Sequence, residues 1–549
     1  MHLRKWTPWA AAILSAVLLE LPFPLAGPMP PWRGIIAFFG LAPLLWAILA
    51  PTESKRPYRR AFLIGYVCGI LWYAANCYWI YDTMRIHGGI PPIGAAGILL
   101  LFSLVLGLYF GLFALALKFI ATRLGTGIAL VAAPFLWTAL DLAAARITCV
   151  PWDQLGYSQV DNQSLNLFAP ITGVYGITFI LVAFNSIFAR VILHPPSRSL
   201  RLFGPLAVFS ILWAFLTAMP LAPSGTAATA VLIQPNLDVA ADNRWNAPDL
   251  WNSHIADFKH LATQPDRSFI VGIPETGAPT LVPECFTPCA NPDLVIWPEA
   301  PAFSFFEADP RFTQTMSSMA QSLRAPLIIG GIGADEVNGN LNTFNSAMLW
   351  ASDGSRIGRY DKIHLVPYGE YIPYRNLFFF AHQLTNQVSD FSRGTERKVF
   401  RIEDAHGQSH RYGIFICYES VFADEIRQFA KNGAEVFVNI SDDGWYGDTS
   451  APWQHLNMAR MRAIENRRWI LRATNNGVTA SIDPYGRVRQ SIPRHTVGSL
   501  VAQYGFNSET TFYTRHGDVF AWLCAILSLG FVVFATNKRP EPKTGSVSV

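Results

Sequence analysis

The chain has 549 residues, of which 51% are hydrophobic and only 15% are charged, and its mean hydropathy is +0.25. A soluble domain carries about 25% charged residues, so much of this surface is expected to avoid water. The formal net charge of +4 is too small to indicate a nucleic-acid partner, and we exclude that class. Seven Cys residues are too few for a disulfide scaffold in a chain of this length.

Eight apolar runs predict eight transmembrane helices, because each approaches or exceeds the roughly 20 residues that cross a bilayer. The runs are 9–25, 34–50, 61–81, 93–120, 127–145, 167–192, 206–221 and 519–536. We expect the first run to remain as a span and not to be cleaved as a signal peptide. Pro22 and Pro24 follow it directly, and another run begins soon afterwards.

The short loops between these runs differ in their positive charge. Taking alternate loops from the N-terminus, one side holds most of the Lys and Arg residues. The opposite side holds Arg33, Arg85 and Arg146, apart from the long segment between the last two runs. Loops rich in Lys and Arg face the cytoplasm, so we expect both termini there and the long segment outside it.

Residues 222–510 have mixed charge, short apolar runs and turn signals, which indicate a globular domain inserted between two spans. We therefore divide the chain into a seven-helix bundle (1–221), an extracytoplasmic domain (222–510) and a C-terminal span with a cytoplasmic tail (511–549). Buried strands are predicted at 229–234, 294–297, 327–331, 347–351, 412–417, 436–440, 469–473 and 478–482. Helices are predicted at 420–431 and 453–468, and this order favours an α/β sandwich.

Three predicted strands or turns are followed by residues that could act together. An acid, Glu299, follows one strand, an amine, Lys362, follows a hairpin-like turn, and a thiol, Cys417, ends another strand. A thiol is nucleophilic only as the thiolate, which needs a nearby base, cation or helix N-terminus. Glu299 would accept the proton, Lys362 would stabilise the thiolate and an oxyanion, and a helix opening near Ser420 would add N–H groups. Each residue also has an ordinary explanation as a packing or surface group, and spacing alone leaves both interpretations open.

The sequence around these residues resembles the Glu, Lys and Cys motifs of the nitrilase superfamily. The motifs are Trp-Pro-Glu299, Asp-Lys362-Ile-His-Leu-Val-Pro-Tyr-Gly-Glu370-Tyr and Ile-Cys417-Tyr-Glu419. With seven spans before the domain and one behind it, the arrangement resembles the bacterial apolipoprotein N-acyltransferase family. Segments 151–159, 234–236 and 513–517, together with Trp245, carry the same resemblance, which covers nearly the whole chain.

This resemblance implies a four-layer α-β-β-α sandwich and a specific set of site residues. Glu299 would be the general base, Lys362 its electrostatic partner and Cys417 the acylated nucleophile, with Glu370, Tyr418, Glu419 and Trp245 in support. The implied reaction moves an acyl chain from the sn-1 ester of a phospholipid, typically phosphatidylethanolamine, to Cys417. The α-amine of an S-diacylglyceryl cysteine at the N-terminus of a lipoprotein then receives it. The enzyme would lie in the bacterial inner membrane with its domain in the periplasm, and we expect no metal or cofactor.

Several details of the domain stay open at this point. A second Pro-Glu pair ends at Glu275, but the sequence around Glu299 matches the motif more closely. Residues 275–292 look like an insertion, and Cys285 and Cys289 form a small disulfide loop or are free thiols. Two segments, 374–380 with its Phe378–Phe380 run and 443–447, are candidates for lipid contact near the sulfur; alternatively, their aromatic rings fill the core.

Two rival functions remain open from the sequence alone. One is a membrane-tethered amidase of the nitrilase type that acts on a small C–N substrate, and the other is a transporter or scaffold whose outer domain only binds ligands. We expect the remaining polar groups to be structural. They are His364, His455, Asp442 and Asp443 in loops and turns, and Glu20 and Asp141 inside the bundle or at its interface.

Overall fold

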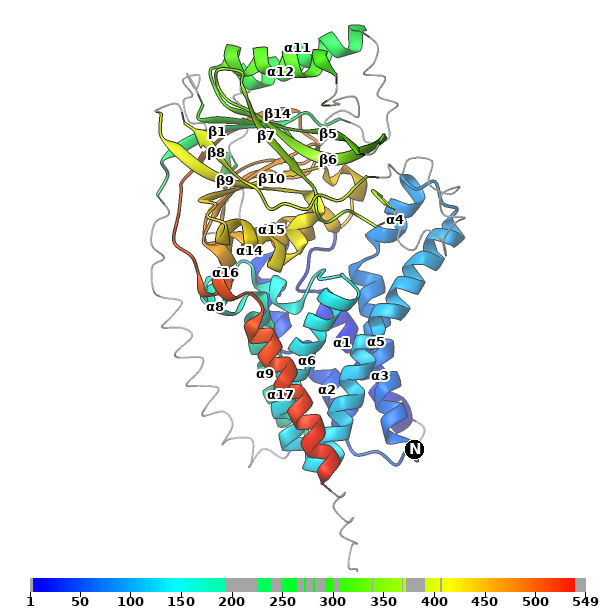
Figure 1. The fold of residues 1–549 in the computed structure, drawn as a ribbon. Helices are drawn as coiled ribbons and strands as arrows, with labels where there is room; N and C mark the ends of the chain where they lie inside the picture. The colour runs from blue at the N-terminus through cyan, green and yellow to red at the C-terminus, as the bar shows by residue number, and fades with distance from the viewer. Residues whose placement is uncertain are drawn as a thin grey trace, which may run out of the picture. The chain divides into compact units, whose positions relative to one another are not determined.

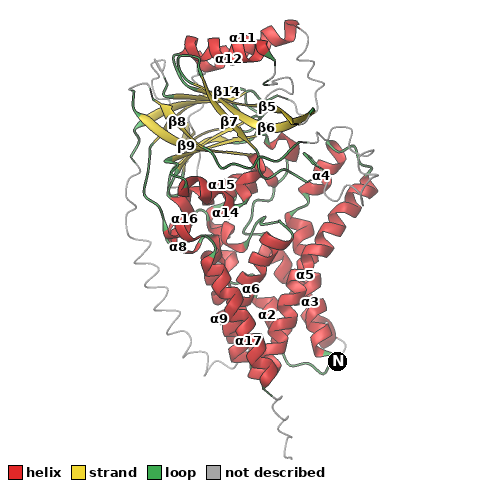
Figure 2. Ribbon diagram, viewed as in Figure 1, coloured by secondary structure: helices red, strands yellow, loops and turns green. Residues whose placement is uncertain are grey.

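The computed structural model describes residues 3–193, 225–237, 248–263, 271–272, 280–281, 292–299, 307, 309–337, 339–367, 369–371, 391–404 and 407–538. The chain forms two compact units. One comprises Met1–Tyr78, Ala96–Pro220 and Asp518–Val549, and the other comprises Trp79–Ala95 and Leu221–Gly517. Figures 1 and 2 show the helices of the first unit and the strands of the second.

The regular secondary structure in the described part of the first unit consists of helices. Its helices are α1 (Leu3–Glu20), η1 (Pro31–Phe38), α2 (Ala42–Leu49), α3 (Pro57–Asn76), most of α5 (Pro92–Leu124), α6 (Thr126–Ile147), η2 (Leu155–Gln159), α7 (Gln163–Asn166), α8 (Ala169–Thr172), α9 (Val174–Leu193) and α17 (Val519–Asn537). Five described stretches are long and apolar enough to cross a membrane: Pro31–Leu49, Pro92–Leu124, Thr126–Ile147, Val174–Leu193 and Val519–Asn537. A sixth arises if Pro57–Asn76 and Trp79–Ile86 form one broken span.

The predicted spans differ from these helices in several places. The run predicted at 61–81 is divided, because α3 ends at Asn76 and α4 (Trp79–Ile86) begins after it. The run predicted from Leu167 is also interrupted, because Gly173 has a φ of 65° that ends α8 before α9 begins. The run predicted at 206–221 lies outside the described residues, so the number of spans stays a prediction.

Helices α3 and α5 approach closely through small residues. A Cβ atom at Gly65 would lie 2.4 Å from the Phe110 carbonyl oxygen, and one at Gly69 would lie 2.8 Å from the Phe110 Cβ. Gly107 and Gly111 on α5 have the same four-residue spacing. In an apolar environment helices associate through packing and not through the hydrophobic effect, so such small-residue pairs favour the contact.

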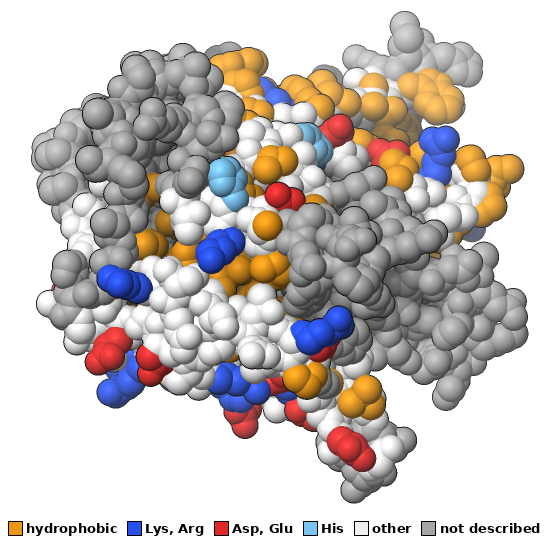
Figure 3. Space-filling model, turned by 90° about the horizontal axis from the view of Figure 1, so that it is seen from above, with side chains coloured by type: hydrophobic (Ala, Val, Ile, Leu, Met, Phe, Trp, Pro, Cys, Tyr) orange, Lys and Arg blue, Asp and Glu red, His pale blue; other side chains and the backbone are white. Residues whose placement is uncertain are grey.

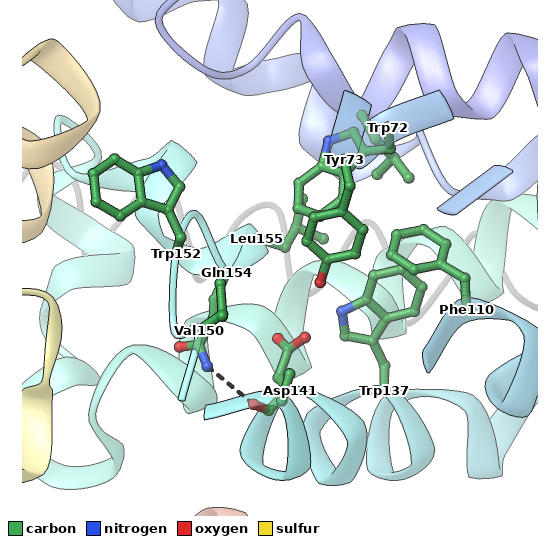
Figure 4. Close-up of a pocket in the computed structure, with 11 residues that line it drawn as sticks. Trp72, Tyr73, Phe110, Trp137, Asp141, Val150, Trp152, Gln154 and Leu155 are labelled. Carbon is green, nitrogen blue, oxygen red and sulfur yellow. Dashed lines mark hydrogen bonds between the residues drawn. The ribbon is translucent and has the colours of Figure 1, made fainter. Parts of the chain in front are cut away.

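Two carboxyl groups lie inside this bundle. Glu20 is only 7% exposed, and the Oδ2 atom of Asp141 is buried. Figure 4 shows the Asp141 carboxyl at a small cavity, with the Tyr73 hydroxyl and the Trp137 indole turned toward it. The side-chain amide of Gln154 donates a hydrogen bond to the Asp141 carbonyl oxygen at 3.3 Å. Both acids therefore lie in the bundle interior, which is one of the two positions expected for them.

The second unit contains two six-stranded sheets. One has the order β14-β1-β4-β5-β6-β7, and the other has the order β13-β12-β11-β10-β9-β8. The strands of the first are β1 (Ala228–Gln234), β4 (Leu294–Ile296), β5 (Leu327–Val337), β6 (Asn340–Trp350), β7 (Arg356–Asp361) and β14 (Gly498–Tyr504). Those of the second are β8 (Val399–Glu403), β9 (Ser409–Ile416), β10 (Val436–Ser441), β11 (Trp469–Thr474), β12 (Thr479–Ile482) and β13 (Val488–Ile492). A separate pair joins β2 (Val271–Gly272) to β3 (Thr280–Leu281).

The two sheets are stacked and covered by helices on both outer faces (Figures 1 and 2). Helices α11 (Pro248–Thr263) and α12 (Pro310–Leu323) cover the first sheet, and α14 (Ala423–Lys431) and α15 (Ala451–Asn466) cover the second. The side chains of β1 alternate accordingly. Ala230 and Leu232 pack between the sheets, whereas Val231 and Ile233 pack beneath α11 and α12. The predicted four-layer arrangement is therefore present.

Helix α15 agrees with the predicted helix at 453–468, but the helix predicted from Ser420 begins later. Residues Cys417–Val421 form a 3-10 turn, η3, and Phe422 then has an extended backbone with φ −90° and ψ 91°. The α-helix starts only at Ala423. The predicted helix N-terminus next to the thiol is therefore wrong.

The outer surface shown in Figure 3 carries charges of both signs. On this face the described Lys and Arg side chains are interspersed with Asp and Glu side chains, and neither sign gathers into a continuous patch among the described residues. This distribution agrees with the low net charge and gives no support for a polyanionic partner.

Candidate active site

The strand order brings the acid, the amine and the thiol to the same region of the second unit. Strands β4 and β5 are parallel, and the antiparallel pairs β5–β6 and β6–β7 make β7 run in the direction of β4. Glu299 and Lys362 follow the carboxyl ends of β4 and β7. Cys417 follows β9, which is parallel to its neighbour β10. Loops at the carboxyl ends of parallel strands are where α/β folds gather functional groups.

Lys362 lies at the centre of the polar cluster and is only 1% exposed. Its Nζ atom is 2.9 Å from Glu299 Oε1 and 2.8 Å from Glu370 Oε1. Burial alone would lower the pKa of the Lys362 ammonium, but the two carboxylates more than offset this effect and raise the pKa well above its ordinary value. Lys362 therefore stays positively charged at neutral pH.

Both carboxylates that contact Lys362 are held by further donors. The side-chain amide of Asn345 donates to Glu299 Oε1 at 2.7 Å and to Glu370 Oε1 at 2.6 Å. The second oxygen of Glu299 accepts the backbone N–H of Asp442 at 2.9 Å, and that of Glu370 accepts the N–H of Val366 at 2.8 Å. These bonds fix the orientation of both acids, because each oxygen has a defined partner.

Cys417 follows the last residue of β9 and is 5% exposed. Its φ of 47° lies in the left-handed region, which is strained for a residue with a Cβ atom. Burial raises the pKa of the Cys417 thiol well above its ordinary value, Glu299 raises it further, and Lys362 lowers it in part. Attack by this sulfur therefore requires a base to remove the thiol proton, which is the role expected of Glu299.

Glu419 joins the loop after Lys362 to the end of β9. Its buried carboxylate accepts the hydroxyl of Tyr360 at 2.9 Å and the backbone N–H groups of Ile363 at 2.7 Å and His364 at 3.2 Å. It also accepts the N–H of Ile416 at 2.8 Å, directly before Cys417. Burial raises the pKa of the Glu419 carboxyl, and the backbone donors offset this only in part.

The remaining expected residues are placed less centrally or are not described. The Tyr418 ring packs edge-to-face on Phe422 with centroids 5.2 Å apart, and Phe422 in turn stacks on the His364 ring at 4.2 Å. Several residues lie outside the described part of the chain, namely Trp245, Glu275, Cys285, Cys289 and the Phe378–Phe380 run.

The structure adds polar residues that the sequence analysis did not place in the site. Asn345 binds both acids from within β6, and His455 lies beneath Cys417 with Nε2 at 2.9 Å from its carbonyl oxygen. A sequence signal existed for a third residue, Arg472, because an arginine inside the apolar strand β11 requires a buried acceptor. That acceptor is Asp443, whose Oδ2 is 2.7 Å from Arg472 Nη2.

No group of three or more His, Cys, Asp and Glu side chains is arranged to hold a metal within the ranges that the structure describes. The donors that are present are committed to one another, as the Lys362 and Glu299 contacts show. A buried thiol, a carboxylate and a fixed ammonium group in one region are the groups that covalent catalysis by a thiol uses.

Two family models match separate parts of the chain. Residues 9–187 match the family model of the apolipoprotein N-acyltransferase N-terminal domain, and residues 279–510 match that of carbon-nitrogen hydrolases. The chain is 33% identical to apolipoprotein N-acyltransferase of Geobacter metallireducens over 93% of its own length and 92% of the relative. This chain belongs to the apolipoprotein N-acyltransferase family. The enzyme of the same name from Haemophilus ducreyi is 27% identical over 97% of this chain and 98% of that protein.

A solved structure shows a more distant likeness. A Saccharomyces cerevisiae member of branch 10 of the nitrilase superfamily is 15% identical, covers 52% of this chain and 93% of its own, and aligns with a TM-score of 0.35. The family matches make the chain an acyltransferase with a nitrilase-like domain and apolar membrane helices. They do not favour the alternative of a tethered amidase acting on a small C–N substrate.

Proposed function

We propose that the enzyme moves the sn-1 acyl chain of a phospholipid, with phosphatidylethanolamine as the typical donor, to the N-terminal S-diacylglyceryl cysteine of a lipoprotein. The observation that carries the proposal is the buried cluster in which Lys362 contacts Glu299 and its charge acts on the Cys417 thiol. Glu299 acts as the general base, Lys362 as the electrostatic partner and Cys417 as the nucleophile. Glu370, Tyr418, Glu419 and Trp245 support these three residues.

In the first step the Glu299 carboxylate takes the proton of the Cys417 thiol as the sulfur attacks the ester carbonyl carbon. The resulting oxyanion is stabilised by Lys362 and by a backbone N–H beside Cys417, and each such donor is worth roughly 3–4 kcal/mol. The ester C–O bond then breaks, Glu299 returns the proton to the leaving oxygen, and a lysophospholipid departs. The acyl chain remains on the sulfur as a thioester.

In the second step the α-amine of the lipoprotein cysteine attacks this thioester. Glu299 takes the proton that the amine must lose, and the C–S bond breaks to form an amide and release Cys417. The sulfur then regains its proton, which closes the cycle as a ping-pong reaction. Lys362 keeps its proton in both steps and does not transfer it, because the two carboxylates raise its pKa despite its burial.

The proposed reaction requires the site to meet lipid on the outer side of the inner membrane. We place the globular domain in the periplasm and both termini in the cytoplasm, with eight spans, because the short loops on one side hold most of the Lys and Arg residues. Segments 374–380 and 443–447 are the proposed lipid contacts. Among the described residues, Trp445 supports this, because it is an aromatic residue that is partly exposed.

The proposal is tested with a phosphatidylethanolamine that carries palmitate at sn-1 and oleate at sn-2. The acceptor is a synthetic peptide that begins with S-diacylglyceryl cysteine and has a free α-amine. Mass spectrometry is expected to show the palmitoyl amide, and an acetylated acceptor serves as the control and gains nothing. Release of free fatty acid without amide, or transfer of oleate alone, would show that the proposed reaction is wrong.

A further inference from the structure

The carbonyl oxygen of Cys417 has a buried partner on another element. His455 lies on α15, is 0% exposed, and places Nε2 at 2.9 Å from this oxygen. A carbonyl oxygen only accepts hydrogen bonds, so Nε2 must carry a hydrogen and donate it. The backbone of Cys417, the residue with the proposed nucleophilic sulfur, is thereby fixed by the His455 side chain of α15.

The other ring nitrogen is fixed by two charged groups. Nδ1 of His455 is 2.9 Å from Asp443 Oδ1 and 3.1 Å from Arg472 Nη2. Arg472 also contacts Asp443 Oδ2 at 2.7 Å, and all three side chains are fully buried. A doubly protonated ring donates from Nδ1 to Asp443, and a singly protonated ring accepts there from Arg472. In both states Nε2 remains the donor to Cys417.

Asp443 is ionised and able to hold the ring. Burial alone would raise the pKa of its carboxyl group, but Arg472 and His455 more than offset this and bring the pKa below its ordinary value. The hydroxyl of Ser441 adds a third donor to Oδ1 at 2.9 Å. Asp443 is therefore a carboxylate held in place by three neighbouring side chains. The members of this network lie on β10, β11, α15 and the turn η4 (Asp443–Tyr446).

The same turn also contacts Glu299, the proposed general base. The backbone N–H of Asp442 donates to Glu299 Oε2 at 2.9 Å, and Asp443 is the next residue. Asp442 thus contacts Glu299 directly. Asp443, the next residue, contacts His455, which in turn contacts Cys417. The turn sets the positions of the proposed base and the proposed nucleophile relative to each other.

We infer that His455 is a positioning residue for the acyl transfer: it holds the left-handed Cys417 turn so that the sulfur faces Glu299 and Lys362. This inference rests on the proposed role of Cys417 as the nucleophile. The strained backbone at Cys417 persists only while its surroundings fix it. A misplacement of about 1 Å at a reacting atom costs about 100-fold in rate, so loss of this hydrogen bond is expected to lower kcat more than it changes KM.

Two substitutions separate the contact to Cys417 from the contact to Asp443. The amide nitrogen in His455→Gln reaches the position of Nε2 and can donate to the Cys417 carbonyl. The shorter side chain in His455→Asn reaches only the Asp443 side. We expect kcat to fall by about 100-fold in His455→Asn with KM changed by less than about threefold, and His455→Gln to recover most of the loss.

The control is His410→Gln, at the opposite end of β9. His410 stacks on Phe506 with centroids 3.5 Å apart and lies 3.6 Å from Glu435, so it loses comparable contacts without touching the Cys417 turn. Its kcat is expected to equal that of the wild type. Should His455→Asn not fold, Asp443→Asn keeps the ring but removes its carboxylate, and it is expected to lower kcat with KM retained.

The acyl adduct on Cys417, measured with phospholipid alone, separates this inference from the proposed function. If the wild type forms no adduct, the proposed function is wrong. If the wild type forms it and both His455 variants form it at the same rate, the inference is wrong. Equal losses of kcat in His455→Gln and His455→Asn would also overturn it, because only a structural role treats the two alike.

Discussion

Lys362 places one positive charge between the carboxylates of Glu299 and Glu370. Asn345 adds a second, neutral donor to both of them. Its amide donates to Glu299 and Glu370 at the same time, so the acids share two donors at one point. Such a buried network is stabilising only while these donors keep their acceptors. The neutrality of Asn345 is therefore as important as its shape.

The isosteric substitution Asn345→Asp tests this balance. It replaces a donor with a third carboxylate, which repels the two that are present and removes one of the donors to each Oε1 atom. We expect kcat to fall by at least about 100-fold, with a loss of stability of about 1–3 kcal/mol. The readouts are steady-state transfer to the lipopeptide and the thermal unfolding midpoint.

The same chemical change at Asn457 serves as the control. Asn457 is partly exposed on α15, and its Oδ1 accepts from Arg460 at 3.1 Å, so a carboxylate there gains an ion pair. Asn457→Asp is expected to keep the wild-type rate. Full activity in Asn345→Asp would contradict the contacts described around Lys362.

Individual residues could be predicted where their chemistry is out of place in the sequence. Glu299, Lys362 and Cys417 follow a strand or turn as an acid, an amine and a thiol, and the resemblance of the motifs around them singled them out as a set. Asn345 and His455 could not be placed in the site from sequence, because a polar residue within a strand or helix does not reveal its partner. Their partners are 46 and 38 residues away along the chain.

At the scale of elements, the turn after β10 and the loop between β11 and β12 pack against each other without spare space. Gly477 lies in that loop and does not have a positive φ. A Cβ atom there would lie 2.2 Å from Asp443 Oδ2 and 2.8 Å from its Cγ. A glycine is needed at position 477 because the Asp443 carboxylate fills the space that a Cβ atom there would need.

Gly477→Ala is expected to displace Asp443 and with it His455 and the Cys417 turn. The predicted result is a fall in kcat of about tenfold or more and a destabilisation of about 1–3 kcal/mol from overpacking. Gly498→Ala is the matched control, because a Cβ atom at Gly498 meets nothing within 4 Å. Equal activity in the two variants would show that Asp443 does not control the site.

The strands found from sequence share one property, which is that they lie inside the sheets. The eight predicted strands correspond to β1, β4, β5, β6, β9, β10, β11 and β12, all of them central. Within these two sheets, the four strands that were not predicted, β7, β8, β13 and β14, are the edge strands. Edge strands carry polar and charged residues, such as Arg356 and Arg359 in β7, so they lack the continuous apolar run of a central strand.

At the scale of the whole molecule, composition alone separated the apolar helices from the globular domain. The low charge content required membrane spans, and family models match the two parts separately at 9–187 and 279–510. The sequence did not predict that α4 would belong to the same compact unit as the domain. There the Thr83 hydroxyl donates to the Trp445 carbonyl oxygen at 3.1 Å.

The proposed orientation predicts which loops can be reached from outside the cell. Cys149 is an exposed free thiol in a loop assigned to the periplasm, and Glu53 is exposed in a loop assigned to the cytoplasm. A membrane-impermeant maleimide added to spheroplasts is expected to modify Cys149. In Glu53→Cys it should modify the new thiol only after the membrane is permeabilised.

Peptide mapping by mass spectrometry assigns each modification to its cysteine, so other thiols do not confuse the result. Cys68, Cys77 and Cys524 are buried and are expected to stay unmodified in the folded enzyme. Labelling of the new thiol at position 53 in intact spheroplasts, with Cys149 protected, would reverse the orientation. The proposed periplasmic site would then be wrong.

The most direct measurement is the mass of the Cys417 peptide after incubation with phosphatidylethanolamine and no acceptor. We predict an increase equal to one acyl chain, removed again when the diacylglyceryl cysteine peptide is added. Cys417→Ala should show no adduct and no transfer. An active wild type whose Cys417 never carries an acyl chain would contradict the account.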